Sequence, residues 1–557
     1  MVTKLKDLLY GETSGLLEAA FLLGGFALFS KLLALVRDRL LAGNFGAGLE
    51  LDIYYAAFRV PDFVFISLAS LVASAVLIPF FVERLGDKED AERFFNSIFT
   101  VFFLAITVVS AILFVAMPRL APLVVPGFDP ASEETMILLS RIMLLSPILL
   151  GLSGLFASVT QALRRFFIYA LTPVVYNLGI ILGILFLYPT FGMPGLAYGV
   201  VLGSLLHFAI QLPVLARNGF LPRFSFGLRF AELERVLALS LPRTITLSAN
   251  HLVILIFIAM ASLVAEGSIA VFNLSYNLQS VPLSVIGISY SVAAFPTLAY
   301  LLSNGKRTAF VSQILTAARH IIFWSIPITV LFIVLRAQIV RTIFGTGEFG
   351  WAETRLTAAA LALFALSVAA QSLLLLFVRG YYAAGYTKKP LFVNVISAVG
   401  TVLLGSFLFS LFSSSETFKY FIETVLRVEG LEGTSILMLP LAFSIGQILN
   451  LVALWIFFSR DFDAPFKEVW LTLRHSFYGA VAMGFVSFES LRVFDDVFDL
   501  NTLFGIFSQG FLSGLIGILA GILLLLLLGN QEVKEIGKAL HGKFWRGKPI
   551  APDQGEL

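Results

Sequence analysis

The sequence contains no cysteine, and only 13% of its 557 residues are charged. The absence of cysteine excludes a disulfide framework, a thiolate metal site and a catalytic thiol. The scarcity of charge excludes a series of soluble domains, because such domains carry about 25% charged residues. A formal net charge of +3 is too small to indicate a nucleic-acid-binding protein.

Motifs for nucleotide or metal chemistry are missing as well. The sequence has no GxxxxGK[ST] phosphate-binding loop, no HExxH pair and no group of residues with metal-ligand spacing. The acidic pair Asp495–Asp496 has no partner base, so we interpret it as solvated. We therefore expect no enzymatic activity, no cofactor and no bound metal.

Apolar residues are abundant: they make up 58% of the chain and form long runs. A bilayer core needs about 20 apolar residues per helix, so these runs predict an all-α integral membrane protein with about fourteen transmembrane helices. The predicted spans are Leu16–Val36, Asp62–Val82, Phe94–Met117, Met136–Thr160, Phe167–Tyr188, Gly195–Ala216, Val236–Leu263, Ser268–Leu302, Ile321–Val340, Leu356–Tyr382, Leu391–Leu411, Ile436–Phe458, Phe477–Phe488 and Leu503–Leu528.

Lys and Arg residues predict the orientation, because they collect in cytoplasmic loops. With the N-terminus inside, the cytoplasmic segments hold about three times as many of the 38 Lys and Arg residues as the outer loops. Both termini are therefore expected in the cytoplasm, and Ser413–Gly433 is expected to form a longer outer loop. We predict an N-lobe over residues 1–217, a cytoplasmic linker over 218–235, a C-lobe over 236–460, two further spans over 461–530 and a basic tail over 531–557.

A faint internal repeat supports two lobes. Four residues near the second predicted span recur 221 positions later: Gly46, Asp52, Tyr55 and Pro61 become Gly267, Asn273, Tyr276 and Pro282. Parallel repeats of this kind are typical of secondary transporters, whose substrate site lies between the repeats.

Charged residues at membrane depth are costly unless they are paired or face a water-filled cavity. The beginning of the chain concentrates them, at Lys31, Arg37, Asp38, Arg39, Asp52, Arg59 and Asp62. Arg59 and Asp62 are three residues apart and share one helix face. One interpretation is a cation-lined cavity for an anionic head group, because Arg suits phosphate. The other is that Arg37 and its neighbours lie at the membrane surface and pair with each other. Weaker candidates are Arg379, near a span end, Asn277, and Asn177, which is suited to hydrogen bonding between helices.

These residues also resemble a known family. Four stretches that carry the resemblance to the MurJ (MviN) lipid II flippases, within the multidrug/oligosaccharidyl-lipid/polysaccharide exporter superfamily, are Ser30–Asp38 (SKLLALVRD), Ala57–Pro61 (AFRVP), Ile343–Phe349 (IFGTGEF) and Arg379–Ala383 (RGYYA). The resemblance implies two six-helix lobes in a V-shape around a cationic cavity, and two C-terminal helices that line a groove for the lipid tail. It implies a bacterial inner-membrane flippase that moves lipid II outward by alternating access. Its partners would be lipid II, membrane lipid and proteins of cell-wall synthesis.

The sequence also departs from the family pattern. Family members carry Arg in the first span where this chain has Lys31, an Arg and a Glu-Gly-Ala motif where it has 65–72, and Arg where it has Asn277. Acids of sodium-binding members align with Phe257 and Gly405. Alternatives therefore stay open: a flippase for another polyprenyl-linked glycan, an exporter of amphipathic molecules, or a membrane scaffold that transports nothing.

Overall fold

The computed structural model describes residues 16–72, 74–84, 86–163, 165–225 and 230–534, and these residues form helices and no strands. They divide into two compact units. Unit 1 comprises the described parts of Met1–Leu274 with Ile343–Leu356 and Thr387–Ala442. Unit 2 comprises Ser275–Thr342, Thr357–Tyr386 and the described part of Phe443–Leu557.

Unit 1 contains most of the helices from the first half of the chain. Its elements are α2 (Leu16–Phe45), α3 (Leu49–Ala57), α4 (Arg59–Ala69), η1 (Ser70–Val72), α5 (Ser74–Arg84), α6 (Lys88–Val124), α7 (Pro130–Met143), α8 (Leu145–Ala162), α9 (Phe166–Leu182), η2 (Gly183–Leu187), α10 (Tyr188–Phe191), α11 (Met193–Ala209), α12 (Leu212–Asn218), α13 (Phe230–Ala261), α20 (Lys388–Ser414), α21 (Glu416–Leu426) and η4 (Thr434–Leu437).

Unit 2 is built from the later helices. Its elements are η3 (Leu283–Ile288), α15 (Ser289–Ser303), α16 (Arg307–Val334), α19 (Val368–Ala383), α23 (Lys467–Asp495) and α24 (Leu503–Leu527). Four more helices contribute residues to both units: α14 (Ser268–Pro282), α17 (Arg336–Phe344), α18 (Trp351–Ala365) and α22 (Met438–Phe462).

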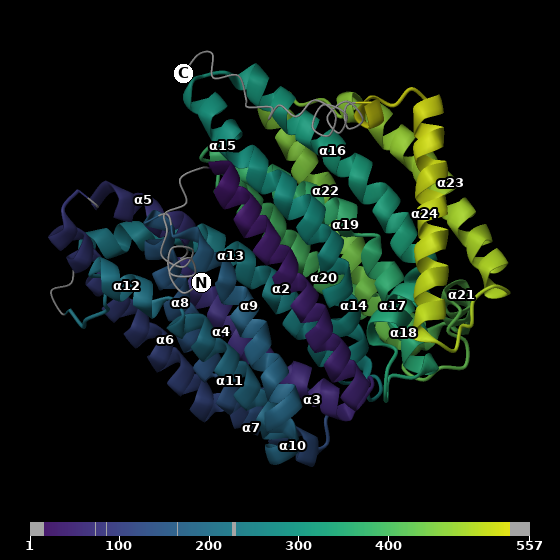
Figure 1. Cartoon of the computed structure of the whole chain (residues 1–557), viewed down its shortest axis with the longest axis horizontal. Coiled ribbons are helices and arrows are strands. Elements are labelled where there is room, and N and C mark those ends of the chain that lie inside the picture. The colour runs from purple at the N-terminus through teal and green to yellow at the C-terminus, as the bar shows by residue number, and fades with distance from the viewer. Residues whose placement is uncertain (1–15, 73, 85, 164, 226–229, 535–557) are drawn as a thin grey trace, which may run out of the picture. The chain divides into compact units, whose positions relative to one another are not determined.

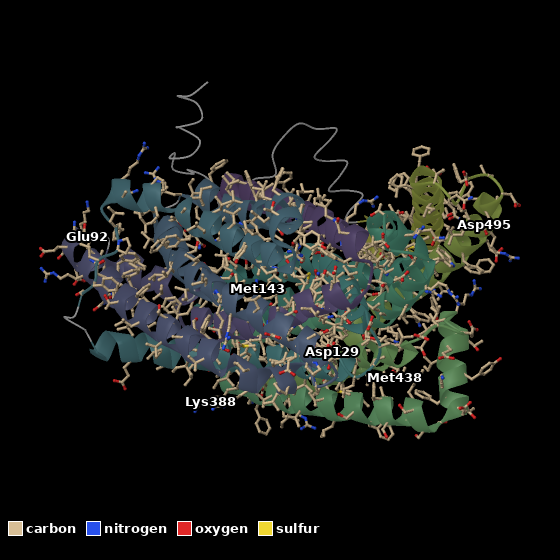
Figure 2. The ribbon with its side chains drawn as sticks, turned by 90° about the horizontal axis from the view of Figure 1, so that it is seen from below. Glu92, Asp129, Met143, Lys388, Met438 and Asp495 are labelled. Carbon is tan, nitrogen blue, oxygen red and sulfur yellow. The ribbon has the colours of Figure 1, made fainter. Side chains whose placement is uncertain are left out.

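Acidic caps define where two of the long segments begin. The Asp87 side chain accepts hydrogen bonds from the second and third backbone N–H groups of α6, and Asp129 does the same for α7. Such caps satisfy N–H groups that have no partner within the helix. Polar side chains gather at these helix ends, for example around Glu92 near the start of α6 (Figure 2).

Glycines let α9, with the η2 turn that follows it, approach α11 closely within unit 1. A Cβ at Gly179 would lie 2.2 Å from the Cα of Gly203, and one at Gly183 would lie 2.4 Å from the Cα of Gly199. Helices α9 and α11 therefore pack backbone to backbone, as membrane helices with small residues do. Helix α2 contacts the same α9, beside which it runs in Figure 1.

In unit 2, α24 packs its glycines inward and its leucines outward. Gly517 and Gly521 are buried against α23, whereas Leu519, Leu523 and Leu527 are exposed. Figure 1 shows the two helices side by side. An apolar outer face with small residues inside is the arrangement expected of a helix surrounded by lipid.

The described residues include eleven helices or helix runs long and apolar enough to cross a membrane. The pair α18–α19, bent by 40°, makes a twelfth if it counts as one span. The predicted spans Leu16–Val36 and Phe477–Phe488 fall within α2 and α23, which are not among these candidates. The chain is thus an all-α, multi-span protein, while the predicted number of about fourteen spans is not confirmed.

Several predicted boundaries differ from the structure, among them the following three. The second apolar segment begins at Leu49 instead of Asp62, because Leu51–Ala57 is buried despite its charged neighbours. The predicted short span Phe477–Phe488 extends over 29 residues as α23. The expected outer loop Ser413–Gly433 contains α21. Residues 226–229 of the predicted linker and 535–557 of the predicted tail lie outside the described residues.

Candidate functional site

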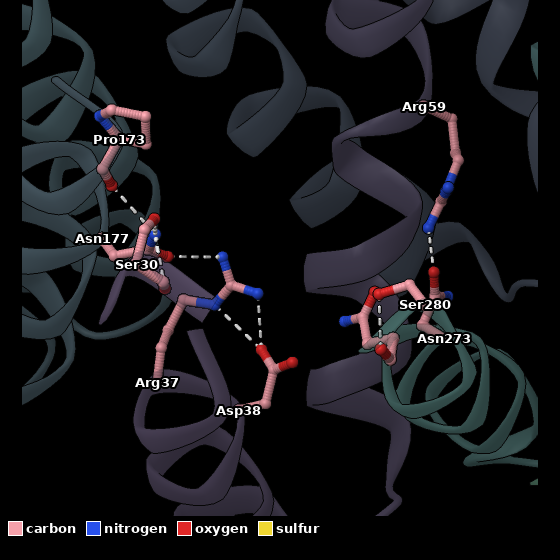
Figure 3. Close-up of polar contacts among 9 residues, drawn as sticks. Ser30, Arg37, Asp38, Arg59, Pro173, Asn177, Asn273 and Ser280 are labelled. Atoms are coloured by element: carbon pink, nitrogen blue, oxygen red, sulfur yellow. Dashed lines mark hydrogen bonds and ion pairs between the residues drawn. The ribbon is translucent and has the colours of Figure 1, made fainter. Parts of the chain in front are cut away.

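An ion pair between neighbouring residues of α2 forms the centre of the candidate site (Figure 3). Arg37 donates from Nε and Nη2 to Oδ1 of Asp38, at 2.9 and 2.7 Å. Its Nη1 donates to Oδ1 of Asn177 on α9, at 3.2 Å. The Asp38 side chain is 2% exposed and that of Arg37 is 20% exposed. The acid is therefore sealed in the protein, whereas the guanidinium keeps an accessible edge.

Helix α9 presents Asn177 to α2 through its own hydrogen bonds. Asn177 Nδ2 donates to Oγ of Ser30 at 3.2 Å and to the carbonyl of Pro173 at 3.0 Å. Proline has no N–H, so Pro173 cannot bond to the carbonyl of Tyr169 one turn before it. The Thr172 hydroxyl donates to that carbonyl instead, at 2.8 Å. The proline is thus accommodated, and the Asn177 amide is oriented with its oxygen toward Arg37.

Lys31 lies on α2, nearly two turns before Arg37, and is partly buried. It interacts electrostatically with both Arg37 and Asp38. A second cation thus lies near the ion pair on the same helix. Its flexible ammonium lacks the planar fork that suits phosphate.

Arg59 begins α4 and reaches another part of unit 1. Its Nε donates to the carbonyl of Tyr55 at 3.2 Å, and its Nη2 donates to Oδ1 of Asn273 in α14. Asn273 Nδ2 donates in turn to the carbonyl of Ile269, at 2.8 Å. The amide is therefore turned with its oxygen toward the arginine (Figure 3).

Asp62 links the surroundings of the two arginines. It lies one turn after Arg59 on α4 and interacts electrostatically with Arg59 and with Arg37. Tyr176 interacts with Asp62 and Arg37, and His251 interacts with Arg59. The spacing of three residues already predicts that Asp62 shares a helix face with Arg59. Its interaction with Arg37 crosses from α4 to α2, so only the fold could identify it.

Asp52 has a different environment. Its Oδ2 accepts from the N–H of Gly267 and its Oδ1 accepts from the N–H of Ala270, each at 2.7 Å. The residue is 2% exposed. Because the N–H groups at a helix start lack intrahelical partners, a carboxylate placed there stabilises the helix. Both oxygens of Asp52 thus hold the beginning of α14.

The other two weaker candidates, Asn277 and Arg379, lie in unit 2. Asn277 is half-buried on α14, and its carbonyl accepts from the Ser280 hydroxyl at 2.7 Å. Arg379 is half-buried on α19. The described residues of unit 1 therefore bring together Lys31, Arg37, Asp38, Asn177 and Arg59, place Asp52 at the start of α14, and add Asp62.

A model of the family described as "Lipid II flippase MurJ" matches residues 41–504 of this chain. The chain belongs to the lipid II flippase MurJ family. The probable lipid II flippase MurJ of Vibrio cholerae is 25% identical over 544 residues, covering 94% of this chain and 98% of that protein. The probable MurJ of Thermotoga maritima is 28% identical over 386 residues, covering 69% of this chain and 77% of that protein.

Solved structures show the same fold. A lipid II flippase MurJ in an inward closed conformation has a TM-score of 0.71 at 22% identity and covers 93% of this chain and 99% of its own. An inward-facing multidrug resistance MATE transporter of the MOP superfamily has a TM-score of 0.61 at 14% identity and covers 83% of this chain and 98% of its own.

Hydroxyl groups occupy the α4–η1 stretch where the MurJ resemblance places an Arg and a Glu. Ser67 Oγ lies 2.9 Å from Ser248 Oγ, and Ser70 Oγ lies 2.8 Å from Thr244 Oγ1. These pairs join the second apolar segment to α13 within unit 1. A neutral contact between helices thus stands where that resemblance places charged groups.

Apolar packing occupies the positions that align with the acids of sodium-binding MurJ proteins. Phe257 on α13 is fully buried, and a Cβ at Gly405 on α20 would lie 2.7 Å from its Cε1 atom. The ring therefore fills the space that the missing side chain at 405 leaves. Neither residue offers the side-chain oxygen that a hard cation prefers.

Proposed function

We propose that this protein moves lipid II from the cytoplasmic to the outer leaflet of the bacterial inner membrane by alternating access. The observation that carries the proposal is the Arg37 guanidinium, held by Asp38 and Asn177 but with an exposed edge. A pyrophosphate-linked head group cannot cross hydrocarbon by itself, and arginine binds such oxygens through its planar set of donors.

The acids near the arginines suggest how an empty site is kept stable. Asp38 and Asp62 balance much of the charge of Lys31, Arg37 and Arg59, so fewer cations are left without a counter-charge before cargo binds. An unpaired charge at membrane depth would be costly. An incoming pyrophosphate would then exchange with the carboxylates for the arginine donors. This exchange needs no covalent step, so we infer transport without catalysis.

The topology expected from the charge distribution completes the proposal. Both termini would lie in the cytoplasm, residues 1–217 and 236–460 would form the two lobes, and the spans of 461–530 would line the path of the lipid tail. Membrane lipid and proteins of cell-wall synthesis would be its partners. Cysteine accessibility in intact cells would test the orientation, because the chain has no cysteine of its own.

Rescue of a bacterium depleted of its own lipid II flippase tests the function. We expect the unchanged chain to restore growth and Arg37→Ala to fail, because the substitution removes the cation that best matches the MurJ pattern. Lys419→Ala, which removes an exposed cation of α21, is the matched control and should rescue fully. Membrane levels of each variant must be equal. Full rescue by Arg37→Ala would refute the site assignment.

A second candidate, a flippase for another polyprenyl-linked glycan, is favoured by one feature. Hydroxyl pairs at Ser67 and Ser70 and an amide at Asn277 replace three charges of the MurJ pattern. Hydroxyls and amides both donate and accept hydrogen bonds, so they suit the hydroxyl groups of a sugar. Failure of the well-expressed, unchanged chain to rescue lipid II transport, together with binding of a different polyprenyl glycan, would favour this candidate.

A further inference from the structure

Helix α21 is a short amphipathic helix directly after α20. The Ser415 hydroxyl accepts from the N–H of Phe418 at 3.3 Å and caps the helix start. Arg427, with a φ of 61°, ends it. Between these caps the apolar residues recur at the three- and four-residue spacing of one helix face. They are Phe418, Phe421, Ile422, Val425 and Leu426.

One side of α21 is fixed to unit 1. Ile422 is buried, and Oε1 of Glu423 accepts from the Thr434 hydroxyl at 2.6 Å. Arg355 donates from Nε and Nη2 to the carbonyl of Arg427, at 3.0 and 2.6 Å. The helix is thus held at its middle and at its C-terminal end. Its orientation is set by specific contacts and does not depend on a lipid surface to form.

Two apolar side chains on another part of this helix have nothing covering them. Phe421 is 60% exposed and Val425 is 59% exposed. They lie four residues apart, so their side chains are neighbours on the helix surface. Glu416 and Lys419, which are also exposed, lie on the opposite side of the same helix. A fixed helix thus presents an apolar pair on one side and charged groups on the other.

The exposed pair continues an apolar surface that already faces lipid. Helix α20 is a candidate membrane span, and its exposed residues follow helical spacing over 15 positions. They are Phe392, Ile396, Val399, Leu403 and Phe407. At 1.5 Å per residue, the 27 residues of α20 extend about 40 Å, which matches a bilayer with its head-group layers, so α21, which begins two residues after α20 ends, starts at head-group level. Figure 2 shows the short helix after α20 turning away from its axis.

We propose that α21 is an interfacial anchor whose Phe421 and Val425 insert at the boundary between lipid head groups and acyl chains. Helices with one apolar face adopt this position. Its charges favour no anionic lipid: residues 413–433 hold Glu416, Glu423, Glu429 and Glu432 against Lys419 and Arg427. The surface that α21 binds is therefore zwitterionic or neutral lipid, and apolar insertion drives the contact.

Nitroxide labels on the full chain in phosphatidylcholine nanodiscs test the proposal. The cysteine-free sequence allows Phe421→Cys, Val425→Cys and the matched control Lys419→Cys, on the opposite side of α21, to be labelled singly, with Phe407→Cys as the lipid-facing standard. Accessibility to oxygen relative to a water-soluble nickel chelate should be several-fold higher at 421 and 425 than at 419. Adding phosphatidylglycerol should leave the ratio unchanged.

Two results would overturn the proposal. Equal access of the nickel chelate to 421, 425 and 419 would place the helix in water. Low access of both reagents at 421 and 425 would mean that protein covers the pair. Val425→Cys removes little volume from an exposed site, so it keeps the test valid if Phe421→Cys folds poorly. Because depth is measured without transport, the result is independent of which cargo the protein carries.

Discussion

Replacement of Asp52 tests whether this buried acid caps a helix or binds cargo. Asp52→Ala would leave the N–H groups of Gly267 and Ala270 without an acceptor. Each buried, unpaired N–H costs about 1–3 kcal/mol, so the start of α14 should lose about 2–5 kcal/mol of local stability. Asp52→Asn keeps one acceptor oxygen and turns an NH₂ toward the other N–H. The loss of local stability in Asp52→Asn should be about half as large as in Asp52→Ala.

Hydrogen exchange of the peptide that contains residues 267–270 measures this loss. If local opening governs exchange, a loss of about 2 kcal/mol accelerates it roughly 30-fold, because every 1.4 kcal/mol is a factor of ten. Asp52→Ala should exchange fastest and the unchanged protein slowest. Glu50→Gln is the matched control, since Glu50 is an exposed acid on the same α3 helix.

Exchange at 267–270 that is unchanged in both Asp52 variants would refute the capping role. If Asp52→Asn then also lost transport at normal membrane levels, Asp52 would belong to the cargo path, as the sequence interpretation had it. The opposite pattern is faster exchange at 267–270 with transport lost only in proportion to the loss of stability. That pattern would assign Asp52 to the architecture around the site.

Three more predictions concern single positions. Gly267→Ala should lower the thermal unfolding midpoint more than Gly305→Ala, because both have positive φ but only at 267 would the Cβ meet a backbone carbonyl, at 1.7 Å. The Ser132 hydroxyl donates to Asp129 and lowers the pKa of its carboxyl group. The cap that Asp129 forms on α7 should therefore persist at neutral pH and fail only below the ordinary Asp range, as hydrogen exchange against pH would show. Gly405→Ala should lower the unfolding midpoint, and Phe257→Leu should restore it.

Each of these predictions has a contradicting outcome. Equal destabilisation at 267 and 305 would show that backbone conformation alone accounts for the glycine. A cap at α7 that fails at or above the pKa of a free aspartate would contradict the lowered value. Loss of stability at 405 that Phe257→Leu does not relieve would mean that the ring is not what the new methyl meets.

Helices and the first ion pair could be predicted from the sequence because their signals are local. Apolar runs of span length mark the helices, and Arg37 and Asp38 are adjacent in the chain. Asn177 has the side chain expected of a link between helices, and in the structure it bonds Arg37 and Ser30. Its partner lies 140 residues away, so only the fold could identify it.

The partners of Asp52 and the presence of α21 could not be predicted, for different reasons. Asp52 bonds to backbone N–H groups more than 200 residues later, and every residue type offers such groups, so the sequence carries no trace of the contact. Helix α21 is too short and too charged to resemble a span. Its Ser415 cap and helical spacing were present in the pattern but fell within a segment interpreted as a loop.

The buried and half-buried charges of unit 1 divide by the kind of partner they have. Asp52 bonds backbone N–H groups, and Arg39 donates to the carbonyl of Ile343 at 2.9 Å. Backbone partners cannot turn away without unwinding a helix or loop, so these contacts are fixed. Arg37 and the Nη2 donor of Arg59 instead have side-chain partners, which can rotate and release these donors to an incoming anion, while Nε of Arg59 stays on the carbonyl of Tyr55. We therefore propose that cargo binds the arginine donors whose partners are exchangeable, a property that depth in the membrane alone does not reveal.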